Sequence, residues 1–263
     1  MAGFYGTEQQ QQLQRRTQSM SGWIAATPGV YNAGRFAGIE DPDRFPSSEF
    51  DRMLARDGLV GFRMIPSARA RSLFPVLEAM GCRVDQWDIF VGSPEDAGAR
   101  ARMLADAAMP DGVAIRPAPS EPEDGDTIRL QEFLAANGLA PFPGSMLVTA
   151  PPFARTIVLG ADEHIVATGH AYFPHNVHSP YHRHAWVGLI AVDEAWRGKG
   201  LGRLINALLI RAAFDELGAG HVYQMVAPAN GPSRRMVENC GLRCEDSLRS
   251  GVAVPLESAR FTR

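Results

Sequence analysis

A glycine-rich turn leads from an apolar segment into an amphipathic segment and has the composition of a phosphate-binding loop. Residues 192–202 read Val-Asp-Glu-Ala-Trp-Arg-Gly-Lys-Gly-Leu-Gly. Glycines keep side chains away from the first turn of a helix, whose unpaired N–H groups lie at the positive end of the helix dipole. Arg197 and Lys199 add positive charge at the rim of such a nest. We therefore expect this turn to bind phosphate oxygens.

Two other classes of phosphate-binding loop do not fit this spacing. A dinucleotide-binding fingerprint needs its third glycine where Arg203 stands, and no acidic-ended second strand follows at the required distance. A P-loop needs four residues between its glycines and a hydroxyl residue after the lysine, where this chain has Gly200. A turn that serves backbone geometry alone stays open as an alternative at this point.

The elements that must position this turn follow a regular order after residue 112. Apolar residues after the turn recur at i, i+3, i+4, i+7, i+8 and i+11, which predicts a helix with one buried face. The residues of this face are Leu201, Leu204, Ile205, Leu208, Leu209 and Ala212. The other predicted helices are 126–137 and 233–239, and the predicted strands are 113–116, 155–159, 165–173, 185–192, 222–226 and a last one that ends at 254.

The first 110 residues are harder to interpret. Helices are predicted over 48–57, 67–80 and 93–109, strands over 60–65 and 83–91, an irregular loop over 22–46, and a polar tail or solvated helix before it. Pro110-Asp111-Gly112 is taken as the boundary between an N-terminal region, 1–111, and a second domain, 112–263. A faint similarity between 77–83 and 237–243 leaves three roles open for the N-terminal region: a degenerate half-copy of the second domain, a cap over an acceptor pocket, or a dimer contact.

Two motifs give the second domain a family resemblance. Arg197-Gly-Lys-Gly-Leu-Gly202 matches the R/Q-x-x-G-x-G/A signature of the GNAT acyltransferase superfamily. The segment from Asn230 to Leu242 is similar to the family's N-x-x-S/A-x-x-x-x-E-x-x-G-F segment and lies at the expected distance. The chain thus resembles this superfamily over about residues 113–254. The resemblance implies an α/β fold with a mixed sheet, to which this chain adds an N-terminal α/β region.

The resemblance also implies acetyl-CoA as the co-substrate. The amides of 197–202 would hold its diphosphate, the backbone near 189–192 would pair with the pantetheine arm, and Asn230 is similar to the family's pantetheine-contacting asparagine. Arg234 and Arg235 would reach the ribose phosphate or be ordinary solvated arginines, and both interpretations stay open. The residues assigned to CoA are Ile190, Ala191, Val192, Arg197, Gly198, Lys199, Gly200, Leu201, Gly202, Asn230, Ser233 and Arg235.

The catalytic groups depart from the family pattern. A thioester is already activated, so the enzyme mainly aligns an amine and stabilises an oxyanion, for which one backbone N–H near Val192 suffices. Val237 stands where many members have a tyrosine acid, and Trp186 and Gly188 stand where some have a Glu or His base. Tyr223, Ser233 or water are the candidate acids, although a CoA thiol, with a pKa near that of cysteine (about 8.5), leaves with modest help.

Six of the seven histidines lie between His164 and His184. Three interpretations compete: imidazoles that line the acceptor pocket and act as base, a zinc site, or a polar surface hairpin without chemistry. No metal is expected, because metal sites usually combine such spacing with Cys or acidic ligands. His184 is the candidate base, since it stands at the start of the predicted central strand.

Composition limits the partners. The chain has 263 residues, of which 45% are hydrophobic, and a net charge of −3. This net charge argues against attraction to nucleic acids or membranes by bulk charge. Cys82, Cys240 and Cys244 form no disulfide framework and fit a reducing cytosol, so we expect a cytoplasmic protein.

The sequence therefore predicts an enzyme, an acetyl-CoA-dependent N-acetyltransferase. It would move an acetyl group to a primary amine of a small-molecule acceptor by direct transfer in a ternary complex, because no activated nucleophile is evident. A non-catalytic CoA-binding regulatory module and a metal-dependent enzyme built on the histidines are the alternatives, and a homodimer is allowed for.

Overall fold

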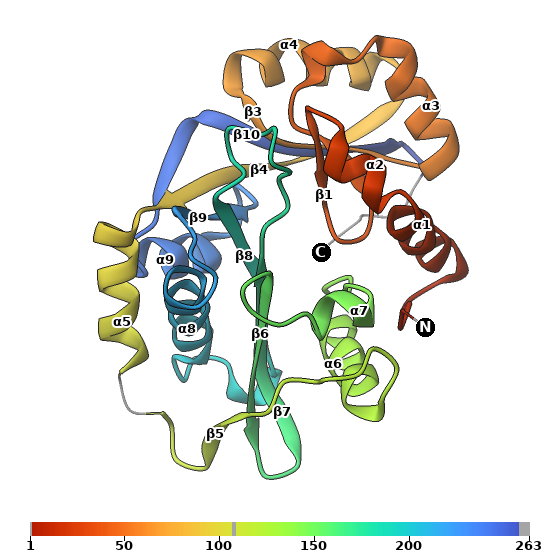
Figure 1. The fold of residues 1–263 in the computed structure, drawn as a ribbon. Helices are drawn as coiled ribbons and strands as arrows, with labels where there is room; N and C mark the ends of the chain where they lie inside the picture. The colour runs from red at the N-terminus through yellow and green to blue at the C-terminus, as the bar shows by residue number, and fades with distance from the viewer. Residues whose placement is uncertain (1, 107–108, 258–263) are drawn as a thin grey trace.

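The computed structural model describes residues 2–106 and 109–257, and its strands form one mixed sheet (Figure 1). The strand order is β1-β2-β3-β10-β4-β9-β8-β7-β6-β5. The strands are β1 (Val30–Asn32), β2 (Ala37–Ile39), β3 (Val60–Pro66), β4 (Cys82–Gly92), β5 (Val113–Arg116), β6 (Ala154–Ala161), β7 (His164–Tyr172), β8 (His184–Val192), β9 (His221–Val226) and β10 (Arg243–Pro255).

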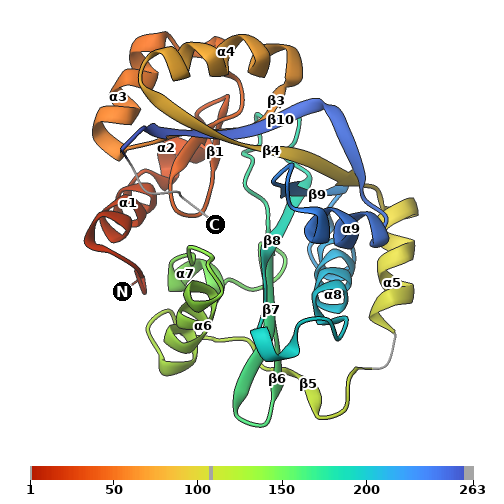
Figure 2. The same cartoon turned by 180° about the vertical axis from the view of Figure 1, so that it is seen from behind.

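Helices cover both faces of this sheet. Figures 1 and 2 show α5, α8 and α9 on one side of β6–β8, α6 and α7 on the other, and α3 and α4 over the outer face of β3, β4 and β10. The helices are α1 (Glu8–Ser19), α2 (Ser21–Ala26), α3 (Ser47–Asp57), α4 (Ser67–Ala79), α5 (Ala99–Ala105), α6 (Gly125–Ala136), α7 (Gly144–Leu147), α8 (Leu201–Asp215) and α9 (Gly231–Asn239), with short helical turns at Pro42–Arg44, Pro94–Gly98 and Glu194–Trp196. No helix within 2–106 and 109–257 is both long and apolar enough to span a membrane.

Helix α8 is the centre of the largest hydrophobic cluster. All six residues of its predicted apolar face are buried, and they pack with side chains of β6–β9 and α5. This burial confirms the predicted apolar face, but the prediction of a single buried face is wrong, because Asn206, Ala207, Ile210, Ala213 and Phe214 are buried as well. Burial of α8 also fixes the position of the glycine turn, which joins β8 to the start of α8.

The predicted helices and strands are present with end points shifted by a few residues, and two predictions need correction. The segment 22–46 is not irregular throughout, because it contains α2, β1 and β2. The segment predicted as one helix over 93–109 contains a π-helical turn, Pro94–Gly98, which Ser93 caps, and then α5, which ends at Ala105. Residues 107 and 108 of this prediction lie outside the described part of the chain. Short strands of three residues offer too few positions for an alternating pattern to be detected.

The sheet crosses the boundary expected at residues 110–112. Strand β4, from the N-terminal side, pairs with β9, and β10, from the C-terminal end, lies between β3 and β4. The two sides of the chain therefore share one sheet, and the division at residue 111 stays a prediction about folding units.

Candidate active site

Strands β8 and β9 run parallel and separate after three residue pairs. They pair only over His184–Trp186 and His221–Tyr223. On its other edge, β8 pairs with β7 through a bulge, in which Leu189 and Ile190 face Gly169 alone. Leu189 takes a positive φ of 51°, which is uncommon for a residue with a branched side chain. Beyond Trp186, the edge of β8 toward β9 thus has no strand partner in the described sheet.

The separation of the two strands opens into a cavity of about 220 Å³. Its walls come from β8, β9, the start of α9 and, on the opposite side, the N-terminal region and β10. The lining residues include Tyr31, Arg35, Phe36, Phe62, Arg63, Trp87, Leu139, Trp186, Gly188, Leu189, Ile190, Gln224, Asn230, Ser233, Val237 and Ser250. Residues of the N-terminal region thus form one wall of the cavity, and the role of this region as a cap over an acceptor pocket stays a prediction.

The glycine turn has the conformation that its composition predicts. Gly198 and Gly200 have φ values of 78° and 84°, and a Cβ at either position would meet nothing within 4 Å. Glycine is therefore required by the left-handed backbone and not by crowding. Gly200 is the N-cap of α8 and provides no side-chain cap, so the cap residue leaves the amides of the first turn of this 15-residue helix uncapped.

The start of α9 borders the same cavity. The Asn230 side chain caps this helix by accepting a hydrogen bond from the N–H of Ser233 at 3.1 Å, and both residues line the cavity. Arg235 is exposed. Arg234 instead pairs with Asp88, and its guanidinium lies 4.9 Å from the centre of the Phe90 ring. Arg234 is therefore ion-paired and not simply solvated, and its contact with the ribose phosphate stays a prediction.

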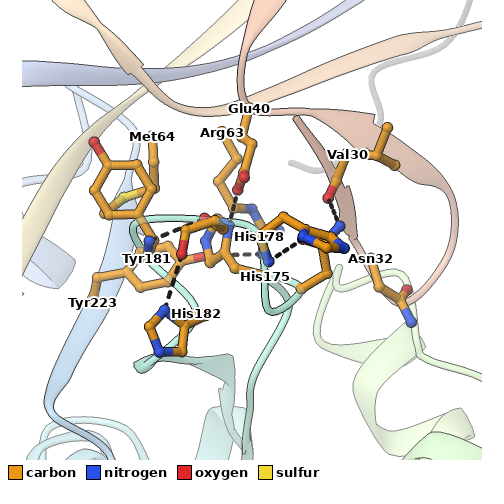
Figure 3. Close-up of polar contacts among 12 residues, drawn as sticks. Val30, Asn32, Glu40, Arg63, Met64, His175, His178, Tyr181, His182 and Tyr223 are labelled. Atoms are coloured by element: carbon orange, nitrogen blue, oxygen red, sulfur yellow. Dashed lines mark hydrogen bonds and ion pairs between the residues drawn. The ribbon is translucent and has the colours of Figure 1, made fainter. Parts of the chain in front are cut away.

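A buried chain of polar groups lies beside the cavity (Figure 3). Nη1 of Arg63 donates to the Tyr223 hydroxyl at 3.2 Å, that hydroxyl lies 3.0 Å from Nε2 of His175, and Nδ1 of His175 contacts the Glu40 carboxylate. Burial lowers the pKa of His175 although Glu40 opposes this, so the ring is neutral at pH 7. Because the Tyr223 hydroxyl accepts from Arg63, its own hydrogen is donated to Nε2, and the ring proton of the neutral imidazole is on Nδ1, toward Glu40.

The comparisons with known proteins agree with this geometry. The family model described as the acetyltransferase (GNAT) family matches residues 121–242, which include the glycine turn, β8, β9 and α9. These residues belong to the GNAT superfamily. A search of curated proteins found no match to the chain.

Solved structures extend the GNAT likeness of the fold to most of the chain. A GCN5-related N-acetyltransferase from Kribbella flavida is 16% identical with a TM-score of 0.58, over 89% of this chain and 80% of that one. A GCN5-related N-acetyltransferase-like protein from Streptococcus suis is 13% identical with a TM-score of 0.55, over 93% and 99% of the two chains. A tandem GNAT protein from the clavulanic acid biosynthesis pathway is 15% identical with a TM-score of 0.51, over 85% and 76%. The predicted GNAT-like mixed α/β fold is confirmed.

The two basic residues of the GNAT turn have partners of their own. Arg197 donates through Nε to the carbonyl of Val192 at 3.3 Å and through Nη2 to Oδ1 of Asn137 at 3.1 Å, which ties the turn to the end of α6. Nζ of Lys199 lies 4.2 Å from the centre of the Trp196 ring. Both side chains remain exposed beside the turn, so their role toward phosphate stays a prediction.

Apolar atoms occupy the positions of the missing GNAT acid and base. Val237 is buried and lines the cavity. The Trp186 indole lies over Gly188, where a Cβ would come within 2.1 Å of the ring. Glycine at 188 thus makes room for the tryptophan, and neither strand position provides a titratable group.

The three candidate catalytic residues differ in their access to the cavity. Ser233 lines it. The Tyr223 hydroxyl is fully buried and donates to His175, and burial raises its pKa. His184 stacks on His221 with ring centres 4.7 Å apart, at the end of β8 where the strands still pair. The acid and base roles of Tyr223 and His184 stay predictions, and neither side chain is among those that line the cavity.

The other histidines do not gather into a metal site. Within 2–106 and 109–257, no group of three or more His, Cys, Asp or Glu side chains could hold an ion. The segment 174–183 instead attaches the N-terminal region to the sheet. Nδ2 of Asn176 lies 2.8–3.0 Å from the carbonyl oxygens of Ile24, Thr27 and Val30, and the N–H of Asn32 donates to the carbonyl of Pro174 at 2.8 Å.

Buried histidines make the stability of this fold dependent on pH. Burial lowers the pKa of His170 to about 3; burial, then the neighbouring histidines, lower that of His184 to about 4. In the unfolded chain both titrate near ~6.5, so below that pH the unfolded chain binds more protons and the folded state loses stability. We expect the Tm measured in thermal scans to fall as the pH is lowered from 6.5 to 5. In His170→Gln the Tm should fall less steeply with pH. His164→Gln, at an exposed position, is the control; a Tm that does not change over this range would contradict the prediction.

Proposed function

We propose that this chain is an acetyl-CoA-dependent N-acetyltransferase that acetylates a primary amine of a small-molecule acceptor by direct transfer. One observation carries the proposal: the unpaired edge of β8 runs from the open glycine turn to a cavity enclosed by the N-terminal region. At about 220 Å³, this cavity is smaller than the sites that hold drug-sized ligands. Its size supports a small acceptor.

The residues present fit the donor. The uncapped amides at the start of α8 would bind the diphosphate, and the free edge of β8 would pair with the pantetheine arm as an added strand. Asn230 and Ser233, on the far wall, would border the same arm. The bound thioester would supply an activated acyl group, so the chain itself needs no nucleophile.

The chain's own groups would align the amine and stabilise negative charge. The bulge at Leu189 and Ile190 interrupts the ladder between β7 and β8, two to three residues before Val192, and is the expected source of the oxyanion donor. The ionised groups that line the cavity are Arg35 and Arg63, without an Asp or Glu among the lining residues. Nearby positive charge lowers the pKa of an ammonium ion, so Arg35 would favour the neutral, reactive amine without a dedicated base.

Turnover and binding measurements together test this function. We expect release of free thiol from acetyl-CoA with a subset of a broad panel of primary amines, and binding of CoA detected by calorimetry. CoA binding without turnover on the panel would favour the non-catalytic module, which the missing acid and base equivalents keep as the second candidate. Absence of both signals would refute the proposal.

A further inference from the structure

Two buried hydrogen-bond donors beside the cavity have no acceptor. Nε of Arg63 and Nε1 of Trp186 lack a hydrogen-bond partner in the described part of the chain. Arg63 is 5% exposed and Trp186 is 8% exposed, and the guanidinium lies 5.5 Å from the centre of the indole ring. Buried donors are nearly always satisfied in folded proteins. A pair that borders one cavity therefore indicates that a ligand provides the acceptor atoms.

The charge of Arg63 is also not neutralised by direct contact. None of the ion pairs found within residues 2–106 and 109–257 includes Arg63. Its neighbours are tyrosines, with the ring centre of Tyr31 at 4.7 Å and that of Tyr223 at 6.0 Å, and the hydroxyls of Tyr31, Tyr172 and Tyr223 are its neutral hydrogen-bond partners. Arginine stays protonated in proteins, and a buried charge is costly unless it is paired. An anionic ligand would remove this cost.

The fold holds Arg63 in place at this wall. Arg63 and Met64 face Ser250 alone across a bulge between β3 and β10, and Met64 has a φ of 57°. A bulge of the same kind, in which two residues face one, lies on the opposite side of the cavity at Leu189 and Ile190. Bulges next to active sites turn a side chain out of its regular direction. The contact with Tyr223 then fixes Nη1, and Glu40 is kept from the guanidinium by the His175 ring and the Tyr223 hydroxyl.

We propose that Arg63, assisted by the Trp186 N–H, binds a carboxylate of the acceptor, so that the substrate is a primary amine that also carries a carboxylic acid. This inference rests on the proposed acetyltransferase function. The planar guanidinium fork matches a carboxylate, and the phosphates of CoA are assigned to the glycine turn at the other end of β8. The aromatic side chains of Phe36, Phe62 and Trp87 in the same cavity favour an apolar substituent on the acceptor.

Matched acceptors test the charge directly. The wild-type chain is assayed for thiol release with leucine, leucinamide, leucine methyl ester and 3-methylbutylamine, and with the corresponding phenylalanine series, within a broader panel of primary amines. We expect kcat/KM to be roughly 100-fold higher for acids than for their amides, the size of effect that accompanies loss of one partner of a buried charge pair. In Arg63→Gln we expect this ratio to approach one through a loss confined to the acids. Arg63→Lys should retain part of the ratio, and Arg243→Gln, at an exposed arginine of β10, should keep it.

Each outcome separates this inference from the acetyltransferase proposal. CoA calorimetry on Arg63→Gln shows that the variant is folded. Equal or better turnover of amides and decarboxylated amines by the wild-type chain overturns the inference and leaves the function standing, as does an equal loss on acids and amides in Arg63→Gln. If no amine is acetylated, the function fails, and thermal shift decides the inference: acids must raise the Tm of the wild-type chain and not of Arg63→Gln, and equal or absent shifts overturn it.

Discussion

Replacing Gly200 with valine is expected to weaken the binding of CoA by roughly 10- to 100-fold, because a non-glycine residue held in a left-handed conformation costs about 1–3 kcal/mol. Gly200 has a φ of 84° and is the residue from which α8 begins. A β-branched residue there would shift the backbone toward negative φ and move the first-turn amides that are proposed to hold the diphosphate. Isothermal calorimetry with CoA measures the effect.

Gly81 offers a matched control for this substitution. It has the same φ of 84°, a Cβ there would also meet nothing within 4 Å, and it joins α4 to β4. Figure 1 shows α4 well away from α8, the helix that the turn precedes. Gly81→Val should therefore lower the Tm by an amount similar to Gly200→Val while CoA binding stays at the wild-type level. Wild-type affinity in a folded Gly200→Val chain would mean that these amides do not bind CoA.

The turn and α8 could be predicted because their signals are local. The helix repeats apolar residues every three to four positions, and Gly198, Gly200 and Gly202 lie within five residues of one another. The Asn230 cap of α9 is equally local, since its partner is Ser233, although from the sequence we assigned Asn230 only to the pantetheine arm and did not predict the cap. These features depend on residues a few positions apart, so one sequence is enough to find them.

The opposite wall of the cavity could not be predicted, because it depends on residues far apart in the chain. Tyr31 forms an isolated bridge with His175, and Arg63 contacts Tyr223 across 160 positions. Nothing in the spacing of these residues indicates that they meet. The bulges at Met64 and Leu189 likewise place non-glycine residues at positive φ, for which their residue types provide no signal.

The composition of the histidine-rich segment suggested catalytic or metal chemistry, but in the fold this segment attaches the N-terminal region to the sheet. The spacing of His175, His178 and His182 allowed a base, a metal site or an inert hairpin. In the fold, His175 is buried between Glu40 and Tyr223, whereas His178 and His182 are exposed. Burial differs so sharply within eight residues because the segment lies against the N-terminal region on one side only.

Replacing His175 with alanine is therefore expected to destabilise the fold by about 3–5 kcal/mol, the cost of removing one partner from a buried polar pair. The substitution would leave the Glu40 carboxylate buried without its donor and the Tyr223 hydroxyl without its acceptor. It would also leave a cavity the size of the imidazole ring. Urea unfolding followed by circular dichroism measures the free energy of unfolding.

Two further variants separate the unpaired carboxylate from the lost packing. His178→Ala, in the same segment but exposed, should change the free energy of unfolding by no more than about 0.5 kcal/mol. Adding Glu40→Gln to His175→Ala replaces the unpaired charge with a neutral amide and should recover part of the loss, because desolvating a charge costs more than desolvating an amide. If the double variant is no more stable than His175→Ala, the cavity and not the carboxylate accounts for the loss. If His175→Ala has the same free energy of unfolding as His178→Ala, the buried hydrogen bonds that connect Glu40, His175, Tyr223 and Arg63 contribute nothing to holding the N-terminal region over the cavity.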